Sequence, residues 1–498
     1  MSKKEERTRV AGVLMPIFSL PGRYGIGCVS KEAFDFVDFL AAAGQSLWQV
    51  LPLGPTSYGD SPYQSFSSFA GNPYFIGLET LIERDLLSAK KCGMADLGDN
   101  KNDISYDKLY VNRFPLLRKA FKKSDVENDP GFKEFCEKNA DWLYDYALFM
   151  AVKNVYEGKS FLEWDEDIKN REDAALAKYR KKCRKDILFY EFLQYEFFSQ
   201  WKQLKDYANS KGIKLAGDIP IYAALDSSDV WSNPELFQLN EDCTPKAVAG
   251  CPPDAFSATG QLWGNPLYDW DCHRKTGFEW WIKRLEKCFE MYDIVRIDHF
   301  RGFEGYYSIP AKDETAEHGH WEKGPGIALF DAVKKKLGDV PVIAEDLGFL
   351  TPDVIKLLAD SGYPGMKVLE FAFDHREPSD YLPHNYGHNC VVYTGTHDNE
   401  TALGWARNLN KKDRRFCKAY LGCQKTKEIP AALIKAAHAS PADMSVIPMW
   451  DYLELGNEAR INTPSTLGEN WRWRMSDGLL TKTLAKRMKK LAKTYDRV

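Results

Sequence analysis

The sequence predicts an α/β protein built on a (β/α)8 TIM barrel, with large insertions after the second and third strands on the C-terminal face. The first observation is that three short apolar runs, rich in β-branched residues, each end in acidic residues. These segments are 295–299, 342–346 and 392–399. Such a run is typical of a buried parallel strand that delivers a carboxylate to a surface. Because strand C-termini build the active site of a (β/α)8 barrel, the recurrence of this pattern favours that fold.

The second observation is a set of eight candidate strands, placed from apolar runs that end in glycine, proline or acidic residues. They lie near residues 11–16, 47–53, 214–219, 293–298, 341–345, 366–371, 390–394 and 445–449. Helical stretches between most of them supply the alternation that the barrel requires, for example at 32–43, 278–291, 328–336 and 351–360. The last of these has a clear start signal, because Thr351 precedes a proline at the first helical position.

The third observation is that the strands are unevenly spaced. Residues 54–211, between the second and third candidate strands, greatly exceed the single helix of a βα unit, and a second long segment, 222–275, follows the third strand. Both segments leave from the C-terminal end of a strand, so we expect them on the active-site side of the barrel. We therefore expect residues 1–498 to form one catalytic barrel domain in which these two insertion subdomains wall a cleft.

Composition excludes several functional classes. A net charge of −4 gives no electrostatic basis for binding nucleic acid or an anionic membrane. The charged N-terminal residues 1–7 lack the apolar core of a secretory signal, and no segment has the length of a membrane span. The 11 cysteines are scattered without a Cys-x-x-Cys pair, which predicts buried thiols in a reducing compartment and no zinc site. We expect a cytoplasmic protein.

Arg296 and Asp298 lie two residues apart on a predicted strand, so their side chains face the same way. An adjacent positive charge lowers the pKa of a carboxylate, which would keep Asp298 ionised and able to attack an anomeric carbon. The alternative is an Arg–Asp ion pair that only stabilises the rim of the barrel, and this motif alone favours neither interpretation.

Glu345 ends a strongly apolar strand, and Asp346 follows it directly. A carboxyl group desolvated there should have a raised pKa, which suits a general acid/base. Because side chains alternate along a strand, only one of the two can point into the barrel mouth, and the residues alone leave the choice open.

His397 and Asp398 form a polar cluster after the seventh predicted strand. They could bind sugar hydroxyls and oppose the positive charge of an oxocarbenium ion, although Asp398 could instead form an Asx turn that caps the next helix. Carboxylates gathered at strand ends are the groups that glycoside chemistry needs. The 14 tryptophans, which either stack on sugars or fill the core, are compatible with an enzyme that acts on a sugar polymer.

Several motifs resemble those of the 4-α-glucanotransferases called amylomaltases or disproportionating enzymes, relatives of the α-amylase clan. Residues 293–302 resemble the nucleophile region of this family, 343–348 its acid/base region, and 396–399 its third-carboxylate region. Residues 217–222 resemble the region after the third barrel strand. Further similarity at 61–63, 260–268 and 457–464 extends the resemblance from about residue 14 to the C-terminus.

The resemblance implies that Asp298 is the nucleophile, Glu345 the acid/base and Asp398 the transition-state stabiliser. It thereby favours Glu345 over Asp346. It also implies a set of substrate-binding residues on the donor side, on the acceptor side and in a loop over the cleft: Arg296, His397, Asp218 and Asn462; Ser61, Tyr63 and Trp263; Pro253 and Phe256.

The activity implied is double displacement with retention, which moves α-1,4-glucan segments from a donor to the 4-hydroxyl of an acceptor without a metal or cofactor. The partners expected are therefore maltooligosaccharides, starch or glycogen. Two alternatives stay open at this point. One is an α-amylase-like hydrolase, because water can attack the same intermediate, and the other is a non-catalytic glucan-binding protein that retains the barrel.

Overall fold

A computed structural model describes residues 9–498, apart from residues 58, 99, 254–256 and 349. Its centre is a sheet of eight parallel strands in the order β10-β11-β12-β1-β2-β3-β6-β9. Their bounds are Val10–Leu14 (β1), Leu47–Gln49 (β2), Lys214–Ile219 (β3), Ile294–Ile297 (β6), Val342–Ala344 (β9), Gly365–Val368 (β10), Cys390–Tyr393 (β11) and Met444–Pro448 (β12). Each corresponds to one of the eight strands expected from the sequence.

The two ends of this sheet meet, so the expected (β/α)8 barrel is confirmed. The backbone N–H of Ala344, at the end of β9, donates to the carbonyl of Pro364, just before β10, at 2.9 Å. The strands are short and almost entirely buried, as the apolar runs predicted. Where an expected strand is longer than the observed one, a turn takes over: β10 ends at Val368 and continues as the 3-10 turn Leu369–Phe371.

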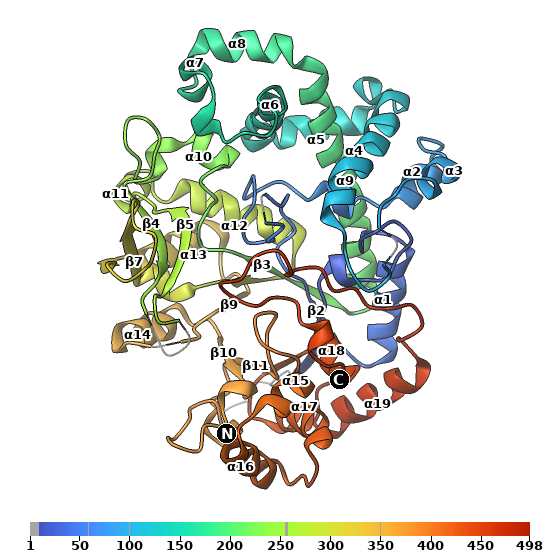
Figure 1. Cartoon of the computed structure of the whole chain (residues 1–498), viewed down its shortest axis with the longest axis vertical. Helices are drawn as coiled ribbons and strands as arrows, with labels where there is room; N and C mark the ends of the chain where they lie inside the picture. The colour runs from blue at the N-terminus through green and yellow to red at the C-terminus, as the bar shows by residue number, and fades with distance from the viewer. Residues whose placement is uncertain (1–8, 58, 99, 254–256, 349) are drawn as a thin grey trace.

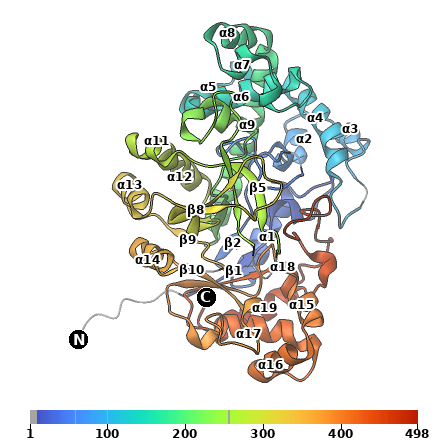
Figure 2. The ribbon, with the colours of Figure 1, turned by 60° about the vertical axis from the view of Figure 1, so that its left-hand side comes forward.

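Helices alternate with the strands around the outside of the barrel (Figure 2). After β1 comes α1 (Lys31–Ala42), after β3 come α11 (Trp270–Lys275) and α12 (Glu279–Met291), after β6 comes α13 (Ile327–Leu337), and after β9 comes α14 (Pro352–Ser361). The connection from β11 to β12 contains α15 (Ala402–Asn408), α16 (Lys411–Leu421) and α17 (Ile429–Ala439). Thr351 caps α14, because its side chain accepts from the N–H of Val354, as its sequence predicted.

The segment between β2 and β3 is a helical layer on one side of the barrel (Figure 1). Its helices are α2 (Leu78–Glu83), α3 (Ala89–Gly93), α4 (Tyr106–Lys123), α5 (Pro130–Lys138), α6 (Ala140–Val155), α7 (Glu166–Lys169), α8 (Asp173–Lys182) and α9 (Arg184–Ser210). The long helix α9 returns the chain to the barrel and fastens the loop after β2. Its buried Gln194 pairs with both the N–H and the C=O of Gly71, and Phe197 packs so closely on Gly71 that a β-carbon there would clash.

A second, antiparallel sheet was not expected from the sequence. Its order is β5-β4-β7-β8, and it joins β4 (Ala247–Cys251) and β5 (Gln261–Pro266) with β7 (Gly305–Pro310) and β8 (His320–Lys323). Another short helix, α10 (Ser228–Ser232), precedes it. Glycine and proline interrupt these strands, which hides their alternation. The sheet also joins two segments separated by a barrel strand, a pairing that no local pattern reveals.

The C-terminal segment of the chain packs against the barrel beside β1 and β12. After β12 and the short α18 (Met449–Tyr452), helix α19 (Lys482–Thr494) packs its buried residues Leu484 and Met488 inward. The fully buried Arg497 then donates hydrogen bonds to backbone carbonyls at the starts of both β1 and β12, including Val10 and Ala442. Within the described residues, no helix combines the length and apolar character needed to cross a bilayer.

We expect Arg497→Ala to destabilise the fold. The substitution removes the buried hydrogen bonds that the guanidinium donates to backbone carbonyls, including those of His438, Ala442 and Asp443, so the free energy of unfolding should fall by about 3 kcal/mol. The matched control is Lys493→Ala, which removes the same charge from an exposed position at the end of α19. Thermal unfolding followed by circular dichroism checks this. Equal unfolding temperatures for the two variants would contradict it.

Candidate active site

A buried guanidinium joins two of the carboxylates at the C-terminal mouth of the barrel. Arg296 on β6 is paired in register with Asp218 on β3, so the two side chains lie next to each other. Its Nη1 donates to both carboxylate oxygens of Asp218 at 2.7 Å, and its Nη2 donates to Oδ1 of Asp298 at 2.9 Å. The side chains of Arg296 and Asp218 are almost fully buried, whereas that of Asp298 keeps 31% of its surface exposed. Asp298 is therefore held in place but is accessible to a substrate.

The backbone of His299, the residue after Asp298, binds Glu345 and so holds it near Asp298. His299 adopts a left-handed conformation with φ of 53°, which turns its N–H toward Glu345. That N–H donates to Oε2 of Glu345 at 2.7 Å, and the N–H of Leu347 donates to Oε1 at the same distance. Asp346 faces elsewhere: it is buried, and its carboxylate accepts from the N–H of Met366 at 2.6 Å. Of the two acidic neighbours, only Glu345 therefore joins the cluster around Asp298.

Burial and charge separate the protonation behaviour of these carboxyl groups. Burial and the negative charge of Asp298 raise the pKa of Glu345 to about 7, although Arg296 and the two backbone N–H donors oppose the rise. Burial also raises the pKa of Asp298, and here Arg296 opposes the rise directly from hydrogen-bonding distance. Because Glu345 is raised in part by the charge on Asp298, the form with Glu345 protonated and Asp298 ionised is favoured near neutral pH.

Asp398 follows β11 and is held by two neighbours, one on each oxygen. Asn462 Nδ2 donates to Oδ1 at 2.6 Å, and Nε2 of the buried His397 lies 3.3 Å from Oδ2. Burial raises the pKa of Asp398, but His397 and Asn462 outweigh it and lower the pKa to about 2. In turn, burial lowers the pKa of His397, but the Asp398 carboxylate outweighs that effect and raises it. Asp398 is thus ionised at neutral pH, and its side chain is 45% exposed.

Two aromatic side chains from the two long insertions reach the same mouth. Tyr63 donates its hydroxyl to Oδ2 of Asp218 at 2.8 Å and stacks on His397, with ring centroids 5.1 Å apart. Trp263, on β5, meets the ring of His299 edge-on at 4.8 Å. Ser61 accepts from the N–H of Tyr63 at 3.3 Å and so supports that residue. The structure therefore brings these residues together with the carboxylates.

Of the two residues expected in an overhanging loop, the structure describes only Pro253. Pro253 is exposed in the connection that follows β4. Phe256 lies outside the described residues. The other ten residues expected in the site all lie in the described part of the chain, and each of them contacts another member of this set or the residue next to Asp298.

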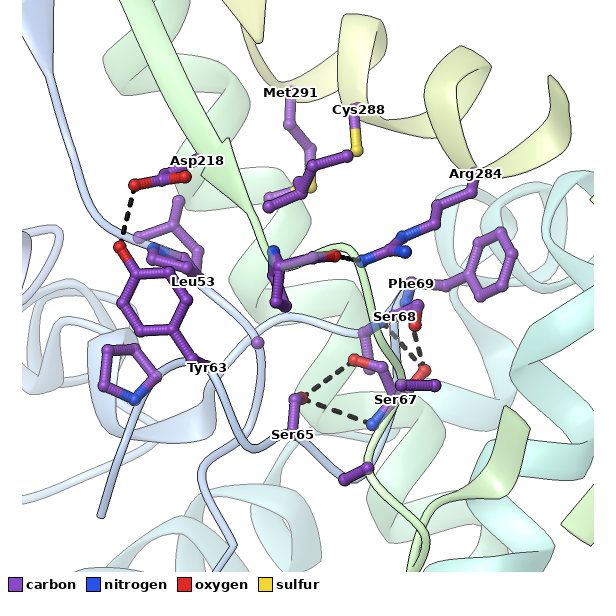
Figure 3. Close-up of a pocket in the computed structure, with 18 of the residues that line it drawn as sticks. Leu53, Tyr63, Ser65, Ser67, Ser68, Phe69, Asp218, Arg284, Cys288 and Met291 are labelled. Carbon is purple, nitrogen blue, oxygen red and sulfur yellow. Dashed lines mark hydrogen bonds between the residues drawn. The ribbon is translucent and has the colours of Figure 1, made fainter. Parts of the chain in front are cut away.

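The wall behind Asp218 is fixed from α12. Arg284, which is almost completely buried, donates to the carbonyls of Pro220 and Ile221, directly after β3. Figure 3 shows Tyr63 and Asp218 on one side of a cavity of about 50 Å³, with Arg284, Cys288 and Met291 of α12 on the other. Strand register thus sets the position of the Asp218 carboxylate, and α12 fixes the backbone that follows β3.

Sequence reasoning missed three residues that support the site. Met366 on β10 offers its sulfur to Nε of Arg296 at 3.3 Å. Arg460 donates to the carbonyls of Asp398 and Asn462, which ties the two polar loops together. Trp471 packs against both Tyr63 and His397. Only Arg460 had a signal, because it lies within the 457–464 motif; Met366 and Trp471 contact the site through tertiary structure alone.

One group of side chains close enough to share a metal ion lies outside the site described above. In the part of the chain that the structure describes, three metal-ligating side chains come close enough to share an ion only at Asp374, His375 and Asp413. These residues lie in the β10–β11 connection and in α16, and none of them was expected in the site.

We expect Met366→Leu to lower kcat about fivefold. Leucine has a similar volume but no acceptor, so Nε of the buried Arg296 loses its hydrogen bond, at a cost of about 1 kcal/mol. Met366→Gln is the control, because its amide oxygen can accept from the same nitrogen. Steady-state rates and unfolding temperatures check this. Full activity in the leucine variant, or equal losses in both, would contradict a positioning role for the sulfur.

Comparison with known proteins gives one consistent result. Residues 15–481 match the family described as 4-alpha-glucanotransferase. A 4-alpha-glucanotransferase of Clostridium butyricum is 50% identical over 97% of this chain and 100% of its own length. One from Thermus thermophilus is 46% identical over 99% of this chain and 100% of its own length.

Solved structures agree with these sequence matches. An amylomaltase from Streptococcus agalactiae, solved in complex with acarbose, is 42% identical and superposes with a TM-score of 0.96. The match covers 98% of this chain and 100% of that structure's chain. An amylomaltase from Corynebacterium glutamicum, 19% identical with a TM-score of 0.77, covers 98% of this chain and shows the same fold. The chain therefore belongs to the 4-alpha-glucanotransferase family.

Proposed function

We propose that this enzyme transfers segments of α-1,4-glucan from a donor maltodextrin to the 4-hydroxyl of an acceptor glucan or glucose, through a covalent ester on Asp298. The observation that carries the proposal is the pairing of an accessible, Arg296-bound carboxylate with a neighbouring carboxyl group whose pKa is raised to about 7. A retaining glycoside reaction needs one ionised nucleophile and one protonated acid, and this pair supplies both at neutral pH.

In the first step, the Glu345 carboxyl donates its proton to the glycosidic oxygen as the bond to C1 breaks. The Asp298 carboxylate attacks C1 from the opposite face, and the cleaved glucan leaves with its new 4-hydroxyl. Asp398, ionised and held by His397 and Asn462, lies where it can oppose the positive charge that develops on the sugar ring. Its exposed surface leaves room for sugar hydroxyls.

In the second step, the 4-hydroxyl of an acceptor enters, and Glu345, now ionised, takes its proton. The acceptor oxygen attacks C1, the ester bond to Asp298 breaks, and an α-1,4 linkage forms with retention. Arg296 stabilises Asp298 as a nucleophile and as a leaving group, because it donates to the carboxylate without needing to move. Every atom transferred comes from the two glucans or from Glu345, so the residues named complete the cycle.

We propose that segments 54–211 and 222–275 serve this barrel as insertion subdomains that wall the cleft. Each contributes one aromatic residue to the mouth, Tyr63 from the first and Trp263 from the second. With Ser61, these residues would shape the acceptor side, whereas Asp218, Arg296, His397 and Asn462 would line the donor side. Pro253 and Phe256, in the connection after β4, would contact a bound glucan from above.

We also propose that the enzyme acts in the cytoplasm on maltooligosaccharides, starch or glycogen. Seven of the 11 cysteines are buried thiols, which suits a reducing compartment. The hydrolase alternative is not favoured, because relatives described as 4-alpha-glucanotransferases match over essentially the full length of the chain.

Incubation with maltotriose alone tests the proposed reaction. We expect glucose together with a ladder of longer maltodextrins and little net increase in reducing ends, because each bond broken is replaced by another. Asp298→Asn should reduce this turnover at least 1000-fold, since an amide cannot form the ester. The control is Asp346→Asn, which changes the neighbouring carboxylate that faces Met366. A steady rise in reducing ends would instead indicate hydrolysis, and an active Asp298→Asn variant would remove the assigned nucleophile.

The pH dependence follows from the same pair. The first step needs Glu345 protonated, so kcat/KM for maltotriose should fall as pH rises through about 7, while protonation of Asp298 sets the acidic limb. The leaving group of α-maltosyl fluoride needs no proton, so fluoride release can still be measured in Glu345→Gln. Because this variant lacks the carboxyl group that titrates near 7, its pH profile should have no basic limb. A basic limb that persists in this variant would assign it to another group.

A further inference from the structure

One tryptophan stands apart from the others. All 14 tryptophans lie in the described residues, and Trp321 alone is exposed, with 43% of its surface accessible. It lies on β8, the edge strand of the antiparallel sheet. A single exposed apolar residue needs no explanation by itself. The environment of Trp321 is what makes it informative.

The ring of Trp321 is held from two directions. The guanidinium of Arg301 lies over one face, 4.0 Å from the ring centroid, and the ring of Tyr307 meets it edge-on at 5.2 Å. Tyr307 is itself buried and fixed by a hydrogen bond from its hydroxyl to the carbonyl of Ala316 at 3.0 Å. Arg301 and Tyr307 thus fix the orientation of the indole, while 43% of its surface stays exposed. The indole is a pre-oriented flat surface.

This surface is connected to the reaction centre by a short, rigid path. Arg301 lies in the 3-10 turn Phe300–Phe303, three residues after Asp298, and the N–H of Phe300 in that turn donates to the carbonyl of Glu345 at 3.0 Å. The N–H of Gly324, just after β8, donates to the carbonyl of Glu304 at 2.8 Å. Lys323, the last residue of β8, also forms ion pairs with Glu304 and Asp353. Glu304 lies in the connection after β6, and Asp353 lies in the first turn of α14, so these pairs link β8 to both segments. Strand β8, which carries Trp321, is thus linked to the segments that follow Asp298 and Glu345.

We propose that Trp321 is an outer acceptor subsite that stacks on a glucose ring of a long acceptor glucan. The ligand class follows from chemistry, because the apolar C–H face of a pyranose matches a flat aromatic surface, and a cation on the opposite face orients the indole. The occupant follows from continuity: Trp321 is attached to Arg301 beside Glu345, the group that accepts the proton of the incoming hydroxyl. The inference rests on the proposed function, since it extends the acceptor side of that site.

The subsite makes a length-dependent contribution to acceptor use. A maltohexaose acceptor extends farther from the reaction centre than glucose does, so we expect maltohexaose, and not glucose, to reach Trp321. Stacking should therefore lower KM for long acceptors without altering kcat. It should also favour transfer to longer chains over transfer to free glucose.

The test measures initial fluoride release from α-maltosyl fluoride, with glucose or maltohexaose as acceptor. We expect Trp321→Ala to raise the acceptor KM for maltohexaose about fivefold, to leave that for glucose unchanged, and to leave kcat unchanged with both. Trp321→Phe, which keeps a smaller flat ring, should lose less. Tyr144→Ala, which removes an aromatic residue of similar exposure from α6, is the control and should change neither value.

Each remaining outcome is decisive. Equal effects of Trp321→Ala on glucose and maltohexaose would overturn the subsite, because they would indicate a disturbance of Arg301 and the reaction centre. An unchanged KM for maltohexaose would overturn it as well. Failure of the proposed function would look different: the unmodified enzyme would then release fluoride at a rate that neither acceptor increases.

Discussion

The candidate site depends on one buried cation. Arg296 neutralises Asp218 and binds Asp298, and without it two carboxylates would be left in a largely desolvated barrel mouth. Its charge also separates the roles of the acidic groups: it opposes the rise in the pKa of Asp298 at hydrogen-bonding distance, while burial and the charge of Asp298 raise the pKa of Glu345 to about 7. The same arginine would stabilise the leaving carboxylate when the ester on Asp298 breaks. Removal of this one side chain would disturb binding, nucleophile and acid/base together.

The barrel makes this arrangement possible because it brings distant parts of the chain to one edge. Asp218, Arg296 and Glu345 come from three strands that are neighbours in the sheet, β3, β6 and β9, so strand register sets their spacing. Asp398 comes from the far side, after β11, and is reached by the polar loop that carries Asn462. Tyr63 and Trp263 come from the two insertions. The barrel holds the groups proposed for the chemistry, and the insertions supply aromatic surfaces that suit a glucan.

Much of this could be predicted from the sequence, for identifiable reasons. The eight strands were visible because short apolar runs end in sharp polar signals, and Asp298 and Glu345 were visible because they follow such runs. The choice between Glu345 and Asp346 needed either a family resemblance or the structure, since alternation permits one inward side chain without saying which. The sheet β5-β4-β7-β8 was missed, because its strands pair across a barrel strand and are broken by Gly250 and Gly264. Met366 and Arg497 were missed as well, because their contacts exist only in the folded chain.

The account makes one claim on which the others depend, namely that Asp298 carries the sugar between the two glucans. The most direct measurement is mass spectrometry of the Glu345→Gln variant after reaction with α-maltosyl fluoride. The fluoride leaves without a proton, but an acceptor cannot be deprotonated efficiently, so the intermediate should accumulate. We expect a maltosyl adduct on the peptide that contains Asp298, and its loss as maltosyl azide when azide, a nucleophile that needs no deprotonation, is supplied. A stable adduct on any other residue, or fluoride release without any adduct, would contradict the account.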